Sequence, residues 1–234
     1  MHKKIVLLLS LLLLVSTSAF AAKPVIGVSE FTNDTSAAWW YGGVGDDLAD
    51  MLTNELAGTG KFKVVERAKL GPVLEEQDLA ASGRVSKATG AKIGKLTGAE
   101  YLIMAELSAF ETDVKGTGGG VSFRGVSLGG KKEDAYMAVD LRVINTTTGE
   151  IEFTRTVEAR ASSGGLNVGL YRGGFGGNLS KYEKTPTGKA IRAVVMEISE
   201  YLACAMVDQG DCMAEYEAKE SSRREKTKKA IKLD

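Results

Sequence analysis

Two short segments of the chain are so rich in glycine that they restrict the fold more than any other feature. Residues 115–130 (KGTGGGVSFRGVSLGG) and 163–177 (SGGLNVGLYRGGFGG) together hold 14 of the 28 glycines in 31 of the 234 residues. Glycine inside a strand costs conformational entropy and contributes no side-chain packing. Both segments lie next to stretches that alternate like β-strands, so neither is typical of a linker between domains. A compact core gains little from them, which makes them the first candidates for a functional role.

The first residues of the chain have the pattern of an export signal. Lys3 and Lys4 precede an apolar run over residues 5–15, and Ala19-Phe20-Ala21 is a small-x-small cleavage site. The run has 11 residues, which is too short for a helix that spans a bilayer. We therefore expect a signal peptide over residues 1–21, cleavage between Ala21 and Ala22, and an exported mature chain. No cysteine lies near the cleavage point, so we expect no lipid anchor there.

Charge and histidine content narrow the function. Without Lys3 and Lys4 the chain has 28 basic and 30 acidic residues, a formal charge of −2, which offers no electrostatic footprint for nucleic acid. The only histidine is His2, inside the signal. The mature chain therefore has no imidazole base, no Ser-His or Cys-His pair and no histidine metal ligand. We expect no enzymatic activity, no cofactor and no metal site.

Hydrophobic periodicity predicts an α+β fold, a mixed α/β sheet with flanking helices. Strands are predicted over residues 25–31, 62–65 and 100–110, and a hairpin over 135–143 and 151–159. Helices are predicted over residues 46–56, 68–77, 86–97 and 189–207. We expect a single domain over residues 22–212, followed by a charged C-terminal tail over residues 213–234 that forms a solvated or fraying helix.

The glycine-rich segments extend from the predicted sheet. The first lies between a strand that ends near Phe110 and one that begins near Asp134, and the second follows the strand that ends near Arg160. This placement suits hairpins over residues 111–133 and 160–181, with two surface loops as the alternative. A lone hairpin leaves unpaired edges in lipid, so spanning strands would require a closed barrel built by several chains. The candidate membrane residues are Val121, Phe123, Val126, Leu128, Leu166, Val168, Leu170 and Phe175.

Several stretches, in order along the chain, resemble the CsgG family, the curli secretion and holdfast-attachment group of bacterial outer-membrane proteins. They are LADMLTNELAGTGKFKVVERAKLGPVLEEQ (Leu48–Gln77), AKIGKLTGAEYLIMAEL (Ala91–Leu107) and AVDLRVINTTTGEI (Ala138–Ile151). In addition, ETDVKGTGGG (Glu111–Gly120) resembles the start of the first membrane-spanning hairpin of the curli secretion channel.

The resemblance implies a periplasmic domain in a ring-shaped homo-oligomer at the outer membrane of a Gram-negative bacterium. Each copy would add its two hairpins to an oligomeric transmembrane β-barrel. Unfolded subunits of an extracellular fibre or adhesin would leave through this pore, with accessory periplasmic and outer-membrane proteins as partners. The channel proteins also carry a lipidated N-terminal cysteine, which this chain lacks at the expected cleavage point.

The resemblance also places a pore constriction in the loop after the first strand. This loop is shorter here than in the channel proteins, and its available aromatic residues are Trp39, Trp40 and Tyr41. They are candidates for the constriction, and the alternative is that they pack on the domain or on a neighbouring subunit. A second functional hypothesis is a soluble periplasmic protein-interaction module, a regulator or adaptor of envelope assembly without pore activity, with the glycine-rich segments as docking loops.

The two cysteines, Cys204 and Cys212, lie at the end of the last predicted helix. An exported compartment permits disulfides, and Gly210 allows the chain to turn back between them. We expect the two cysteines to form a disulfide.

Overall fold

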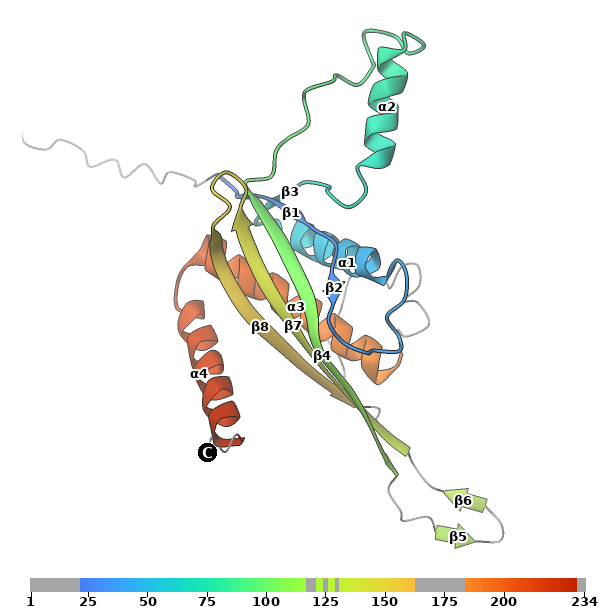
Figure 1. The fold of residues 1–234 in the computed structure, drawn as a ribbon, viewed down its shortest axis with the longest axis vertical. Coiled ribbons are helices and arrows are strands. Elements are labelled where there is room, and N and C mark those ends of the chain that lie inside the picture. The colour runs from blue at the N-terminus through green and yellow to red at the C-terminus, as the bar shows by residue number, and fades with distance from the viewer. Residues whose placement is uncertain (1–21, 117–120, 124–125, 129–130, 163–183, 231–234) are drawn as a thin grey trace, which may run out of the picture.

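A computed structural model describes residues 22–116, 121–123, 126–128, 131–162 and 184–230. Its main feature is one open mixed sheet with the strand order β3-β1-β4-β7-β8 and a short strand, β2, that also pairs with β4 (Figure 1). The bounds are β1 Val25–Val28, β2 Thr32–Asn33, β3 Lys63–Val64, β4 Tyr101–Gly116, β7 Lys131–Asn145 and β8 Ile151–Ser162. The strands β1, β2 and β3 run parallel to their neighbours, whereas β4, β7 and β8 are antiparallel. The predicted α+β architecture is confirmed.

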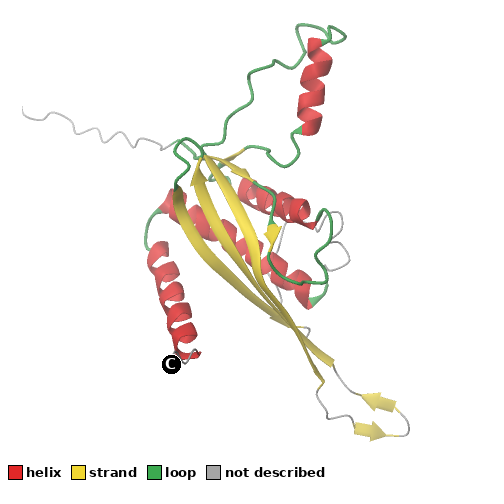
Figure 2. Cartoon of the chain, viewed as in Figure 1, coloured by secondary structure: helices red, strands yellow, loops and turns green. Residues whose placement is uncertain are grey.

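Two helices, α1 (Val44–Thr59) and α3 (Pro186–Ala203), contact each other and cover one face of the sheet (Figure 2). Their apolar stripes meet the inward-facing side chains of the strands, because residues three or four apart share one side of a helix. The largest fully buried side chains of this core are Ile26, Leu52, Leu56, Ile103, Leu107, Leu141, Ile191, Ile198 and Leu202. Within the described residues, no helix is both long and apolar enough to cross a membrane.

The β7–β8 hairpin follows the predicted alternation except at Ile151, which was expected on the inward face and is 56% exposed at the start of β8. Leu141 and Val143 on β7 and Val157 on β8 are buried, whereas Arg142 and Glu158 are exposed, as expected when successive side chains point to opposite faces.

The turn of this hairpin is stabilised by its first residue. The Asn145 side-chain oxygen accepts a hydrogen bond of 3.0 Å from the Thr147 backbone N–H, and the backbone N–H of Gly149 donates to the Asn145 carbonyl at 2.8 Å. Asparagine bonds of this kind mimic a backbone turn, so the short connection is specified locally.

Residues 66–98 form an excursion from the body that differs from the prediction. Helix α2 (Gly71–Ala81) starts three residues later than expected, with a proline in its first turn, where proline is well tolerated. The prediction of a helix over residues 86–97 is wrong: the structure has turns and irregular backbone there. Gly94 is in the left-handed region with φ 73°, and Ile93 is 64% exposed. A helix here would therefore bury no apolar face that could stabilise it.

The C-terminal segment is a helix, α4 (Cys212–Ala230), that follows α3 after a short π-helical stretch over Cys204–Asp208. Cys204 and Cys212 are joined by a disulfide, with their Cα atoms 6.1 Å apart. The helix runs beside the edge strand β8 (Figure 1). Its first part is attached to the body, so the segment predicted as a solvated or fraying tail starts as a docked helix.

Candidate functional site

The β4–β7 hairpin continues well beyond the core. The pairing runs from Tyr101 with Asn145 to Gly116 with Lys131, whereas the described pairing of β8 with β7 ends at Ser162 with Asp134. Figure 1 shows the extension projecting from the body, with strands β5 (Val121–Phe123) and β6 (Val126–Leu128) at its far end. The predicted extension of the sheet over residues 111–133 is therefore present in its described parts.

A β-bulge interrupts the β4–β7 ladder before the hairpin leaves the body. The β4–β7 register shifts between Leu107 and Ala109, and the extra residue, Ser108, has its hydroxyl 3.5 Å from the Ala138 carbonyl. A bulge bends its strand and increases the local twist, so this one can direct the extension away from the sheet.

The candidate membrane residues fall into two groups. Val121 pairs with Leu128 and Phe123 with Val126 in the β5–β6 ladder. The others, Leu166, Val168, Leu170 and Phe175, lie outside the described residues, as does most of the hairpin predicted over residues 160–181. The predicted signal peptide over residues 1–21, with its predicted cleavage after Ala21, also lies outside them.

The aromatic loop packs at the root of the hairpin. Trp39 is only 4% exposed, and its ring lies edge-on against Phe110, with the centroids 5.4 Å apart. Trp40 contacts Trp39 at 5.6 Å and, like Tyr41, is half-buried against the core. Trp39 is therefore a core residue within the chain. Trp40 and Tyr41 keep partly accessible surfaces, and a role of these rings in a pore constriction stays a prediction.

Local contacts hold both ends of this loop. The Asn33 side-chain oxygen accepts hydrogen bonds from the backbone N–H of Thr35 at 2.9 Å and from its hydroxyl at 2.7 Å. At the other end, a Cβ atom at Gly45 would lie 2.4 Å from the Phe31 carbonyl oxygen, so only glycine fits there. These contacts position the rings beside β4.

Helix α4 is attached to the body through one aromatic cluster. Tyr216 is 7% exposed, and its ring meets Tyr201 of α3 edge-on, with the centroids 5.2 Å apart. The Arg155 guanidinium of β8 lies 4.9 Å from the Tyr201 ring centre and 4.8 Å from the Tyr216 ring centre. It also donates a hydrogen bond of 3.2 Å to the Tyr216 carbonyl. Sequence reasoning missed this anchor, although Tyr216 is the only aromatic residue after residue 212.

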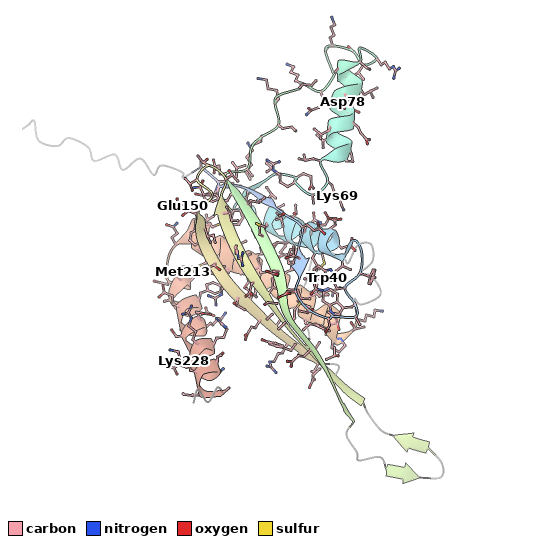
Figure 3. The ribbon with its side chains drawn as sticks, in the orientation of Figure 1. Trp40, Lys69, Asp78, Glu150, Met213 and Lys228 are labelled. Atoms are coloured by element: carbon pink, nitrogen blue, oxygen red, sulfur yellow. A yellow bond between two sulfur atoms is a disulfide. The ribbon has the colours of Figure 1, made fainter. Side chains whose placement is uncertain are left out.

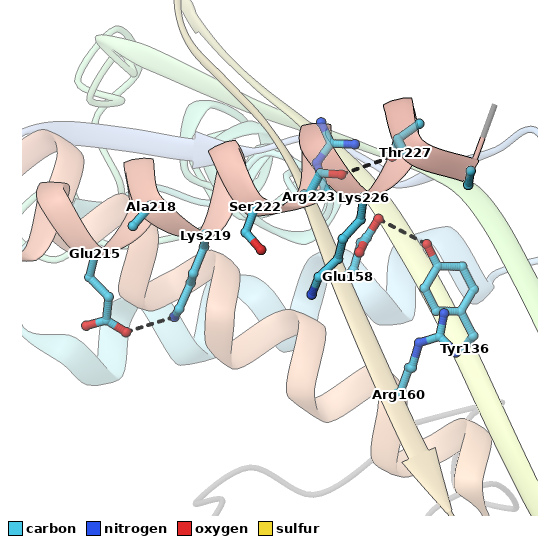
Figure 4. Close-up of a pocket in the computed structure, with 11 residues that line it drawn as sticks. Tyr136, Glu158, Arg160, Glu215, Ala218, Lys219, Ser222, Arg223, Lys226 and Thr227 are labelled. Carbon is cyan, nitrogen blue, oxygen red and sulfur yellow. Dashed lines mark hydrogen bonds and ion pairs between the residues drawn. The ribbon is translucent and has the colours of Figure 1, made fainter. Parts of the chain in front are cut away.

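A cleft of about 780 Å³ separates the rest of α4 from the sheet (Figure 4). On the sheet side, the Tyr136 hydroxyl donates a hydrogen bond of 3.1 Å to Glu158, and the Arg160 guanidinium lies 4.6 Å from the Tyr136 ring centre. The helix side includes Lys219, which pairs with Glu215 at 3.1 Å. The cleft is therefore lined by charged pairs and one aromatic ring, which suits a polar partner.

Two residues of α4 outside the lining of this cleft have clearly shifted pKa values. Burial raises the pKa of Tyr216 to about 12, and the nearby carboxylates of Glu197 and Glu200 act in the same direction. Hydrogen bonds from Arg223 and Arg224 lower the pKa of Glu220 to about 2. Both pKa shifts have structural causes: burial against its neighbours for Tyr216, and ion pairs within the helix for Glu220. In the described part of the chain, no group of three or more histidine, cysteine or acidic side chains is arranged to hold a metal ion.

Comparison with known proteins identifies the family. The family model described as the curli production assembly/transport component CsgG matches residues 8–231. The chain belongs to the CsgG family. One curated relative is a protein of Neisseria meningitidis serogroup B that is named as a lipoprotein. It is 26% identical to this CsgG-family chain over 168 residues, and the match covers 71% of this chain and 66% of the relative's length. The curli component CsgG of Salmonella typhimurium is 26% identical over 126 residues, covering 52% of this chain and 46% of its own.

The chain thus spans between about half and two thirds of the length of these curated relatives. Among solved structures, a hypothetical protein of Chlamydia trachomatis is 16% identical, with a TM-score of 0.48 over 80% of this chain and 99% of its own.

Proposed function

We propose that this CsgG-family chain is a secretion or assembly component of the outer membrane. Several copies would form a ring-shaped pore for the export of unfolded fibre or adhesin subunits, aided by accessory envelope proteins. The hairpins over residues 111–133 and 160–181 would build a shared β-barrel, and Trp40 and Tyr41 would face the exported chain. No step of this mechanism requires catalysis.

The observation that carries the proposal is the extension of β4 and β7. Residues 111–116 continue the β4–β7 ladder as far as Gly116 with Lys131, and β5 adds three more strand residues. Together they approach the ~9–11 residues of a tilted transmembrane strand. A paired extension without a core of its own gains little within a single chain, whereas copies side by side could satisfy its edges. The names of the relatives, a curli assembly component and a lipoprotein, also favour an envelope protein.

The pairing register indicates how to remove the extension without disturbing the body. Val114 pairs with Glu133, so residues 115–132 can be replaced by Asn-Gly, a dipeptide suited to a two-residue hairpin turn. The intact chain should fractionate with the outer membrane, require detergent and migrate as a heat-modifiable oligomer on gels. The shortened chain should fold but appear in the soluble periplasmic extract. Ser122→Thr with Ser127→Thr is the matched control, since it keeps the length and the β-propensity.

The alternative is a soluble periplasmic interaction module, a regulator or adaptor of envelope assembly. The cleft between α4 and the sheet favours it, since a polar cleft of this size could receive part of another protein. A monomeric intact chain in the soluble extract would contradict the pore and support this alternative.

A further inference from the structure

Helix α2 has almost no support from its own chain. Its 11 residues stand apart from the sheet (Figure 1), and only Gln77 and Ala80 are covered to any extent. Within the described residues, no other helix or strand packs extensively against it. Isolated helices shorter than ~12–15 residues are marginal in water, so a stable α2 requires a contact from outside the chain.

The surface around α2 is unusually apolar for an exposed region. Five of the eight large exposed apolar residues of the described chain lie within residues 71–98, namely Val73, Leu74, Leu79, Ile93 and Leu96. The return segment covers only one flank of the helix, where Gly90 lies against the Ala80 methyl group. Exposed apolar residues that gather on one projecting element are typical of an interaction surface.

The charge of α2 indicates the chemistry of the partner. The helix contains Glu75, Glu76 and Asp78 and no basic residue, and all three acidic side chains are exposed. The bases of the excursion lie outside the helix: Arg67 and Lys69 precede it, and Arg84, Lys87, Lys92 and Lys95 belong to the return segment. A complementary surface would therefore combine apolar groups with positive charge.

Such a surface exists on α4 of the same chain. Its exposed residues 224–229 (REKTKK) have four basic side chains and one acidic side chain. Next to them is a groove of about 450 Å³ that is lined by Met213 and the edges of Tyr201 and Tyr216, together with Arg155, Arg224, Glu217 and Glu220. Figure 3 shows Asp78 on α2 and Lys228 on α4 at opposite corners of the molecule, so α4 must meet α2 of another copy.

We propose that α2 of one copy docks on α4 of the next copy, with its acidic residues facing the basic end of α4 and its leucines entering the groove. The proposal rests on the ring proposed above and specifies one contact within it. A contact between two different surfaces of identical chains is heterologous, and it generates a ring when the rotation closes.

Charge reversal tests this contact in the intact chain. One variant carries Glu75→Lys, Glu76→Lys and Asp78→Lys, and a second carries Arg224→Glu, Lys226→Glu and Lys228→Glu. Each should weaken assembly in detergent by at least about tenfold, since like charges then oppose each other, as measured by light scattering after size exclusion. The control is Glu150→Lys with Glu152→Lys, which reverses exposed charges on neither helix and should leave assembly unchanged.

Combining the variants separates docking from misfolding. A 1:1 mixture should recover assemblies in which the two variants alternate, because each junction then joins either the two unaltered surfaces or the two surfaces with exchanged charges. A chain with all six substitutions should recover rings, because its charges are exchanged rather than removed. Rings that persist both in the variant with three substitutions in α2 and in the variant with three in α4 would overturn the α2–α4 contact and leave the pore proposal standing. A mixture in which neither variant assembles with the other would also overturn the contact. An unaltered chain that is monomeric at every concentration would instead contradict the ring itself.

Discussion

Helices α2 and α4 both lie outside the two-layer core, yet they relate to it in opposite ways. Helix α4 is linked to α3 by a disulfide and anchored by Tyr216, which packs on Tyr201 and Arg155. Helix α2 has neither kind of anchor, and Leu74 on it is 45% exposed. Helix α4 also has an ion pair of 3.3 Å between Lys219 and Glu197 of α3, so a buried aromatic ring, a covalent link and an ion pair together attach this highly charged helix. The difference between the two helices suggests that α2 is shaped for contact with another molecule.

The largest expected effect is the loss of the α4 anchor. Tyr216→Ala removes a buried ring from its contacts with Tyr201 and Arg155, and it should lower the free energy of opening α4 by about 3 kcal/mol. Amide hydrogen exchange over residues 212–230 would measure this opening. Tyr216→Phe, the control, keeps the ring and should cost less than about 1 kcal/mol. If Tyr216→Ala left exchange in α4 unchanged, the contrast between the two helices would not hold.

A smaller loss of stability is expected when the pH is lowered. The arginines that pair with Glu220 lower its pKa from 4.5 to about 2, so the unfolded chain binds a proton more readily than the folded chain. The stabilisation is complete above pH 4.5 and is lost as the pH falls through the folded pKa.

The measurement for Glu220 is the stability of α4 as a function of pH. Because these pairs are partly exposed, the contribution should be about 1 kcal/mol, and Glu220→Gln should remove it at neutral pH. Glu225→Gln is the matched control, since Glu225 pairs with Lys229 at 3.7 Å and both side chains are well exposed. An equal loss in both variants would show that the Glu220 pairs have no special role.

The smallest change in stability is expected for a substitution in α2. Leu74→Ala should change the stability of the monomeric chain by no more than about 0.5 kcal/mol, because the side chain is exposed and alanine favours a helix. Chemical denaturation in dilute detergent would measure it, with the buried Leu52→Ala as a control that should cost about 2–5 kcal/mol. A loss above about 1 kcal/mol for Leu74→Ala would mean that α2 is supported within its own chain.

The elements that were predicted well are those with a strong local pattern. The β7–β8 alternation and the apolar stripes of α1 and α3 repeat over many residues, so each element shows which side faces a core. The helix predicted over residues 86–97 failed because its pattern rested on Ile93 and Leu96 alone. Gly90 and Gly94 weaken any helix there, and the body offers no surface to bury those two side chains.

The candidate site was predicted less completely for a similar reason. The position of the glycine-rich hairpin over residues 111–133 follows from the strands on both sides, and the structure has it there in its described parts. The burial of Trp39 depends on Phe110, and the docking of α4 depends on Arg155 and Tyr201. No local pattern reports contacts between residues so far apart in the chain.

The order of the main strands and helices, apart from the wrong helix over residues 86–97, the β7–β8 hairpin and the resemblance to the CsgG family were accessible from residue patterns. These features depend on hydrogen bonds and periodicities within a few neighbouring residues, or on stretches that resemble the family. The placement of Trp39 in the core, of α4 beside β8 and of α2 away from the body required the folded chain. Such placements depend on which side chains, distant in the sequence, can bury apolar area together. These contacts exist only once the sheet has formed.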